Sequence, residues 1–152
     1  MVQRSRISPV LSGIAGEYFV AAELTRRGYI ASLTLRNTRG VDILASNHDA
    51  TRSVGIQVKA AQGSAKSWML NQKVESDIAT NLFFVFVRLN GLSAPEYYIV
   101  PREDVSRYVV ENHKRWLETP GRKGQPRVDT PIRQFIDPEN RYRDRWDLLG
   151  LD

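Results

Sequence analysis

The chain has 152 residues, of which 41% are hydrophobic and 26% charged, as in soluble globular domains. This length suits one domain, and the composition excludes wholly disordered, collagen-like and membrane-spanning chains. The net charge is +5, and residues 1–60 carry eight basic side chains against four acidic ones. Such a charge favours a polyanionic partner such as nucleic acid, and the alternative is that it serves only solubility.

Several classes of site and location are excluded by residue content. There is no cysteine and there are only two histidines, so disulfide scaffolds, thiolate zinc sites and histidine-rich metal cages are excluded. The first residues show no secretory pattern, and the longest apolar run, 82–87, is too short to span a membrane. We therefore expect a cytoplasmic protein with no membrane partner.

The first part of the chain predicts a helix followed by three strands. Ser8 and Pro9 form a helix start signal, and apolar residues recur at helical spacing as far as Gly28, so we expect a helix over about 9–27. Three strand-like runs follow, at 29–35, 41–45 and 53–59.

The second part predicts two more strands and a second helix. Residues 61–71 are typical of a loop or short edge strand, and 73–80 of a weak helix or turn. The run 82–89, which is apolar except for Arg88, indicates a central strand buried on both faces, and a short strand is expected over 96–100. The second helix, over about 102–118, has as its apolar stripe Val105, Tyr108, Val109, Trp116 and Leu117.

This order of elements predicts an α/β fold, a single domain with a mixed β-sheet flanked by helices. The composition changes at residue 119, where the segment 119–131 contains three prolines and two glycines. We therefore expect an α/β core over 1–118 and an irregular C-terminal extension over 119–152 that packs on the core.

Four polar residues form the constellation that indicates chemistry. Asp42 lies within an apolar segment, where an unpaired carboxylate would be costly. Gln57 and Lys59 lie on one face of the following strand, which should pair with the strand that carries Asp42. Glu17, in the middle of the first helix, could point to the same place.

These residue types suit metal-dependent hydrolysis of a phosphodiester bond. Carboxylates from Glu17 and Asp42, with an oxygen from Gln57, would form a hard-oxygen site for Mg²⁺ or Mn²⁺. Lys59 would orient the attacking water and stabilise the developing negative charge.

The motif resembles that of the PD-(D/E)XK nuclease superfamily, which has a restriction-endonuclease-like fold. Gly-Val-Asp at 40–42 is followed, after fourteen residues, by Gln-Val-Lys at 57–59. The helix that carries Glu17 resembles that of small resolvase-like members, and the Gln-x-Lys form that of Mrr-like members. The resemblance implies a DNA endonuclease that uses a divalent metal ion, with Asp42, Gln57, Lys59 and Glu17 as its catalytic residues.

Two positions depart from the pattern of the superfamily. Val41 stands where the name-giving proline would be, and Gln57 replaces the usual acidic residue. One carboxylate fewer is left for the metal, which makes Glu17 more important.

Other basic residues are weaker candidates for binding nucleic acid. Arg36 and Arg39 precede Asp42 and could bind phosphates, while Lys66 and Lys73 could follow a backbone. For each of them, an ordinary solvated surface charge is the alternative.

Two other functions stay open at this point. One is a catalytically degenerate module of the same fold that binds nucleic acid or a protein partner, and the other is a nucleotide-binding enzyme. The second is disfavoured because no GxGxxG or GxxxxGK[ST] segment is present. A homodimer is expected only by analogy with small nucleases that cut two strands.

Overall fold

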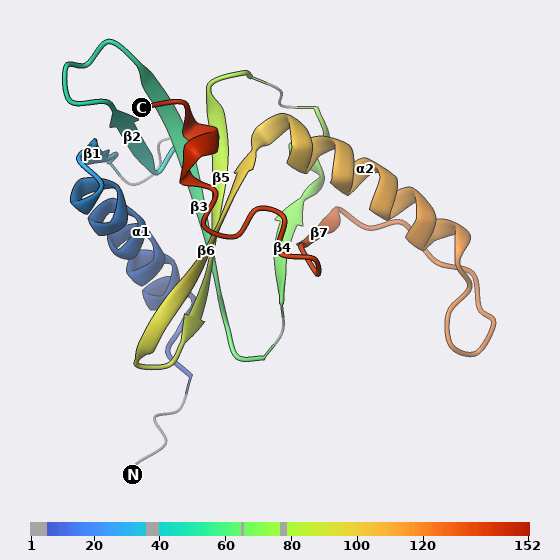
Figure 1. Ribbon diagram of the computed structural model, residues 1–152. Coiled ribbons are helices and arrows are strands. Elements are labelled where there is room, and N and C mark those ends of the chain that lie inside the picture. Colours follow the sequence, from blue (N-terminus) through green and yellow to red (C-terminus); the bar gives the residue numbers. More distant parts are fainter. Residues whose placement is uncertain (1–5, 36–39, 65, 77–78) are drawn as a thin grey trace.

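The computed structural model describes residues 6–35, 40–64, 66–76 and 79–152. A five-stranded mixed sheet lies between a helix on one face and a second helix with a two-stranded sheet on the other (Figure 1). The α/β fold expected from the sequence, a single domain with a mixed sheet flanked by helices, is confirmed.

The first helix, α1 (Pro9–Arg26), begins and ends where the sequence signals predict. The Ser8 hydroxyl accepts a hydrogen bond from the Leu11 backbone N–H at 3.2 Å, which satisfies one of the free donors of the first turn. At the other end Gly28 has a φ of 92°, a conformation that glycine adopts without strain.

The main sheet has one parallel pair, and its other strand pairs are antiparallel. In spatial order its strands are β1 (Ile30–Leu33), β2 (Ile43–Ser46), β3 (Ser53–Gln62), β5 (Leu82–Asn90) and β6 (Ser93–Pro101). The parallel pair is β3 with β5, so β5 lies inside the sheet between β3 and β6. Its residues Phe84–Val87 are buried, as expected for a strand covered on both faces.

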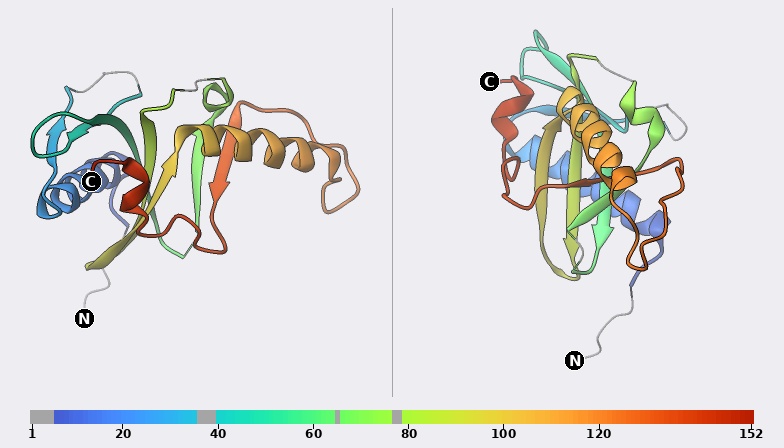
Figure 2. Two further views of the ribbon diagram at one scale, coloured as in Figure 1. Left: turned by 45° about the horizontal axis from the view of Figure 1, so that its top comes forward. Right: turned by 90° about the vertical axis from the view of Figure 1, so that its right-hand side faces the viewer.

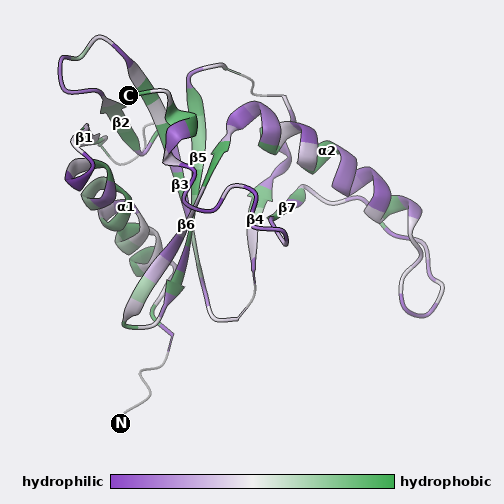
Figure 3. Ribbon diagram, in the orientation of Figure 1, coloured by the Kyte–Doolittle hydropathy of each residue, from purple (hydrophilic) through white to green (hydrophobic). Residues whose placement is uncertain are grey.

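Two apolar cores lie on the two faces of this sheet. Because side chains alternate along a strand, Val85 and Val87 join the core on the α1 side, and Phe84 and Phe86 join the core on the other side. Figure 3 shows apolar residues concentrated on the central strand β5 and mostly polar residues along α2.

The second layer on the far face is a two-stranded sheet with a helix beside it. Strand β4 (Ser67–Asn71), followed by the 3₁₀ turn η1 (Gln72–Glu75), pairs with β7 (Ile132–Ile136). The sequence allowed a short edge strand within 61–71, but it did not predict β7. In the chain, β5, β6 and α2 separate β7 from its partner β4.

The C-terminal segment contributes to both cores. Phe135 packs on the far face, while the turn η2 (Trp146–Leu149) buries Trp146 on the α1 side. The division of the chain at residue 118 into a core and an extension stays a prediction, but the segment 119–152 is not irregular throughout.

Helix α2 (Arg102–Glu118) has the bounds predicted from the sequence. Its first half is buried through Val105 and Val109, whereas its second half extends beyond the sheets, as the left view of Figure 2 shows. The apolar stripe predicted for this helix is not buried at its outer end, because Trp116 is only half-buried and Leu117 is 36% exposed. None of the described helices is long and apolar enough to cross a membrane.

Candidate active site

Strands β2 and β3 bring Asp42 beside Gln57, as the sequence predicts. Asp42 directly precedes β2, and its backbone N–H donates to the Ile56 carbonyl at 2.8 Å. Its carboxylate oxygen Oδ2 accepts a hydrogen bond from the Val58 backbone N–H at 2.7 Å. These two bonds bracket Gln57 and fix the half-buried Asp42 carboxylate at the edge of the strand pair.

Side chains alternate between the two faces of β3, which decides which of them lie on the same side of the sheet. Val58 and Ala60 face α1, because a Cβ added at Gly16 would lie 3.3 Å from Val58 Cγ1 and 2.9 Å from Ala60 Cβ. Gln57 and Lys59 therefore project from the opposite face, the side of α2 and of the two-stranded sheet. Both side chains are half-buried.

A cleft of about 400 Å³ opens on this face, between β3, η1 and the start of α2. The described residues that line it are Gly40, Gln57, Lys59, Leu70, Asn71, Lys73, Val74 and Arg102. The lining thus combines three cationic side chains with the amide groups of Gln57 and Asn71, which is a surface suited to an anionic ligand.

Arg102 is a component of the cleft that sequence reasoning missed. It is the first residue of α2 and only 4% exposed. Its Nη1 donates to Gln57 Oε1 at 3.2 Å, and its Cζ lies 5.0 Å from the centre of the Phe84 ring. A signal was present in the sequence, because a cation in the first turn of a helix is unfavourable for the helix dipole and calls for a compensating role.

Glu17 lies on α1, which packs on the other face of the sheet. It follows Gly16 on α1, which packs on Val58 and Ala60, and its side chain is half-buried. Neither Glu17 nor Asp42 is among the described residues that line the cleft. The joint role of Glu17 and Asp42 in holding a metal ion stays a prediction.

The basic residues named as nucleic-acid contacts fall into three groups. Lys73 lines the cleft, whereas Lys66 is exposed just before β4. Arg36 and Arg39 lie outside the described residues.

Trp68 is buried and donates its indole N–H to the Val87 carbonyl at 3.0 Å. It is therefore a core residue and not a surface on which a base could stack.

The oxygen donors near the cleft are few. Among the described residues, no three histidine, cysteine, aspartate or glutamate side chains form a group that could hold a metal ion. Asp42 supplies a carboxylate, and Gln57 supplies an amide oxygen that already accepts a hydrogen bond from Arg102. Such a set fits Mg²⁺ better than Ca²⁺ or Zn²⁺, because Mg²⁺ keeps several waters and takes only one or two carboxylates together with substrate phosphates.

Comparison with known proteins shows a likeness of fold. No protein-family model and no curated protein sequence matches the chain. A bacterial homing endonuclease, I-Ssp6803I, superimposes with a TM-score of 0.57 at 15% identity, covering 95% of this chain and 94% of the other. The Holliday junction resolvase Hjc from Archaeoglobus fulgidus superimposes with a TM-score of 0.54 at 12% identity, covering 92% and 97%. Both likenesses extend over nearly the whole chain, so the fold is shared from end to end.

Proposed function

We propose that the protein is a metal-dependent endonuclease that acts on DNA. The observation that carries the proposal is that two neighbouring strands pair so that the Asp42 carboxylate binds the Val58 backbone N–H, between Gln57 and Lys59, which line the cleft. One structural neighbour is a homing endonuclease and the other is a Holliday junction resolvase, and both support the same interpretation.

Asp42 and Glu17 would hold a divalent cation, Mg²⁺ or Mn²⁺. When bound, the ion would lower the pKa of a coordinated water and offset negative charge on the scissile phosphate. The Oδ2 atom of Asp42 is oriented by the Val58 N–H, which leaves the other carboxylate oxygen for the ion. We propose Gln57 as a third ligand of the ion. It would use the lone pair of Oε1 that does not accept the hydrogen bond from Arg102.

Lys59 and Arg102 would act on the phosphate. Both are cationic residues of a partly enclosed cleft, where electrostatic stabilisation of developing charge is stronger than in bulk water. Lys59 extends from the strand next to Asp42 and would orient the attacking water. Lys73 on the opposite wall would hold a neighbouring phosphate, with Lys66, Arg36 and Arg39 as further contacts to the backbone.

A cleavage assay with a matched variant tests this proposal. The wild-type protein is incubated with plasmid, linear, single-stranded and branched DNA and with structured RNA, in Mg²⁺, Mn²⁺ or EDTA. Cleavage of DNA is expected only with the metal, and Asp42→Ala should lower it at least about 100-fold with an unchanged melting temperature.

Asp49→Ala is the control for Asp42→Ala. Asp49 is an exposed residue of the loop between β2 and β3, where its Oδ1 accepts a hydrogen bond from the Thr51 hydroxyl at 2.8 Å. Its removal should leave cleavage unchanged. Undiminished cleavage by Asp42→Ala, or cleavage that persists in EDTA, would contradict the mechanism.

One observation favours a second candidate, a non-catalytic DNA-binding module of the same fold. Arg102 donates to Gln57, the position where the superfamily pattern has an acidic metal ligand. This candidate predicts that no substrate is cut and that DNA binding survives Asp42→Ala. Metal-dependent turnover by the wild type would exclude it.

A further inference from the structure

A second basic surface lies far from the cleft, at the outer end of α2. We call the segment 114–127 the basic arm. It holds five basic residues against one acidic residue, Glu118, and so carries +4 of the chain's net +5. Its basic residues are Lys114, Arg115, Arg122, Lys123 and Arg127.

The basic arm has a defined structure. In the loop after α2, the Gly121 N–H donates to the Gln125 carbonyl at 2.9 Å, and the Lys123 N–H donates to Gln125 Oε1 at 2.9 Å. Arg127 closes the loop, because its Nε donates to the Thr119 carbonyl at 3.2 Å and its Cζ lies 4.9 Å from the centre of the Trp116 ring. The charges are therefore displayed from a fixed backbone.

Four of these charges face solvent without an acidic neighbour. Within the part of the chain that the structure describes, no carboxylate lies within 4.0 Å of the side-chain nitrogens of Lys114, Arg115, Arg122 or Lys123, which are all exposed. The other exposed arginines near the C-terminus differ. Arg141 pairs with Glu139 at 2.7 Å, and Arg145 pairs with Asp147 at 2.9 Å.

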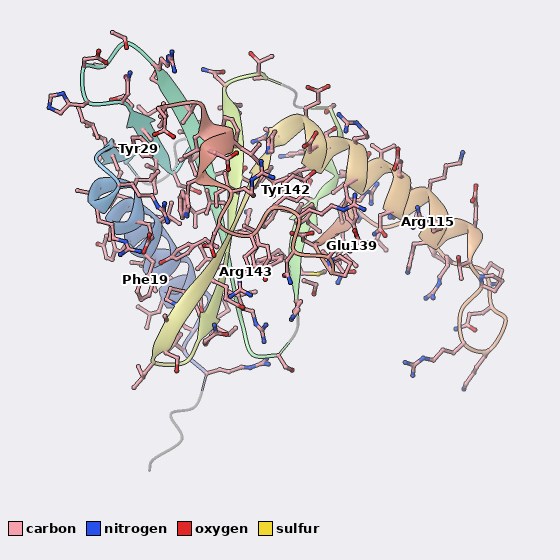
Figure 4. All side chains as sticks on the ribbon, in the orientation of Figure 1. Phe19, Tyr29, Arg115, Glu139, Tyr142 and Arg143 are labelled. Carbon is pink, nitrogen blue, oxygen red and sulfur yellow. The ribbon has the colours of Figure 1, made fainter. Side chains whose placement is uncertain are left out.

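The basic arm is held at a fixed distance from the cleft by α2. Arg102 begins the helix in the cleft and Glu118 ends it beside the loop, a separation of about 24 Å at 1.5 Å per residue. Figure 4 shows Arg115 on the half of α2 that extends away from the two sheets. About seven base pairs of duplex, at 3.4 Å each, span this separation.

We propose that the basic arm binds the phosphate backbone of the duplex whose scissile phosphate lies in the cleft. Unpaired, exposed cations on a rigid support attract phosphates and release condensed counterions, whereas arginines already paired with carboxylates gain little. The claim that the basic arm and the cleft bind the same duplex rests on the proposed function. Binding of the phosphate backbone by the basic arm does not require cleavage.

The first test compares two double variants with the same change in net charge. Arg122→Gln/Lys123→Gln removes two unpaired charges of the basic arm, and Arg141→Gln/Arg145→Gln removes two paired charges elsewhere. Binding to a 20-base-pair duplex is measured in EDTA over a series of salt concentrations, so that cleavage plays no part.

The variant of the basic arm should bind about 10-fold more weakly at low salt. The slope of log K against log salt should become shallower by about 1.8, which corresponds to two phosphate contacts. The control should keep the wild-type affinity and slope. Equal losses of duplex affinity in both variants, or wild-type duplex binding by the variant of the basic arm, would overturn the proposal. The proposal would also be overturned if the variant of the basic arm lost affinity for anionic vesicles or acidic proteins but not for the duplex.

A series of duplex lengths tests whether the basic arm and the cleft share one duplex. The difference between the wild type and the variant of the basic arm should be small on a duplex of about six base pairs and reach its full size by about sixteen. A difference that does not depend on length would overturn this part. If the wild type cuts nothing, the proposed function fails, while the binding result for the basic arm still stands or falls on its own.

Discussion

At the level of single residues, the orientation of Gln57 follows from the chemistry of its neighbour. An arginine has only hydrogen-bond donors, so the atom of Gln57 that lies 3.2 Å from Arg102 Nη1 must be the amide oxygen. The Gln57 amide is thus held by a buried cation. Arg102 is in this sense a positioning residue for Gln57, besides its proposed contact with phosphate.

Substitution of Arg102 should reveal this positioning role. We expect Arg102→Met to lower the rate of cleavage about 10- to 100-fold, the usual effect of losing a residue that orients a ligand. Arg102→Lys keeps the charge but has no planar fork to match both Gln57 and the Phe84 ring, so it should recover only part of the rate. Full activity in a correctly folded Arg102→Met protein would contradict the role.

The sequence could predict part of this site for a physical reason. Asp42 lies against the strand that carries Gln57 and Lys59 because two strands close in the chain pair with each other, and such local pairing is legible in the sequence. Arg102 is 45 residues from Gln57, and their contact depends on how α2 packs against the sheet. No pattern of spacing within one element indicates a contact of that kind.

At the level of elements, α1 is seated by a close contact at Gly16. The contact with β3 leaves no room for a Cβ, which would come within 2.9 Å of Ala60. Gly16 directly precedes Glu17, so the same contact fixes the position of the Glu17 backbone relative to β3.

Two glycines of α1 should respond in opposite ways to alanine. Gly16→Ala should lower the free energy of unfolding by about 1–3 kcal/mol, because the added methyl group overpacks the contact with β3. Gly13→Ala, where nothing lies within 4 Å of the new Cβ, should raise it by about 0.5–1 kcal/mol. Urea unfolding measures both. Equal effects of the two substitutions would show that the helix is not seated through Gly16.

The elements themselves were predictable to different extents. Both helices have local start signals, and their bounds agree with the prediction to within a residue. Strand β7 was missed because its pairing with β4 joins distant segments and leaves no local pattern. Trp116 fits the helical stripe of α2, but it lies outside the buried cluster that Val105 and Val109 join, and the extent of that cluster cannot be read from helical periodicity.

At the level of the whole molecule, the net charge that a segment shows depends on where the limits of the segment are placed. A division of the chain at residue 118 separates Lys114 and Arg115 from Arg122 and Lys123, so the segment 61–118 is balanced and the segment 119–152 has a surplus of only one. The segment 114–127, taken as one window, has a surplus of four. A cytoplasmic location and a homodimer stay predictions.

The stability of the folded protein should fall at high pH through buried tyrosines. Burial, with the nearby Glu23 carboxylate as a second cause, raises the pKa of Tyr97 from 10.0 to about 12. The folded state therefore holds the phenol proton more tightly than the unfolded state does. The contribution of this group to stability is complete below pH 10 and is lost as the pH rises from 10 to about 12.

Tyr97→Phe tests this dependence. The substitution keeps the packing of the ring against Trp146, so the free energy of unfolding at pH 7 should change little. Between pH 10 and 12 the variant should lose less stability than the wild type, as measured by urea unfolding at each pH. An equal decline in the two proteins would assign the effect to other groups.

The catalytic role of the cleft is best examined by single-turnover cleavage of DNA with protein in excess, comparing the wild type with Lys59→Met in Mg²⁺. Both proteins should bind the DNA, since Lys73, Arg102 and the basic arm are unchanged. The wild type should cut it, and Lys59→Met should do so at least about 100-fold more slowly. Equal rates of cutting in the two proteins would contradict a catalytic site in which Asp42 acts together with Gln57 and Lys59 of the cleft.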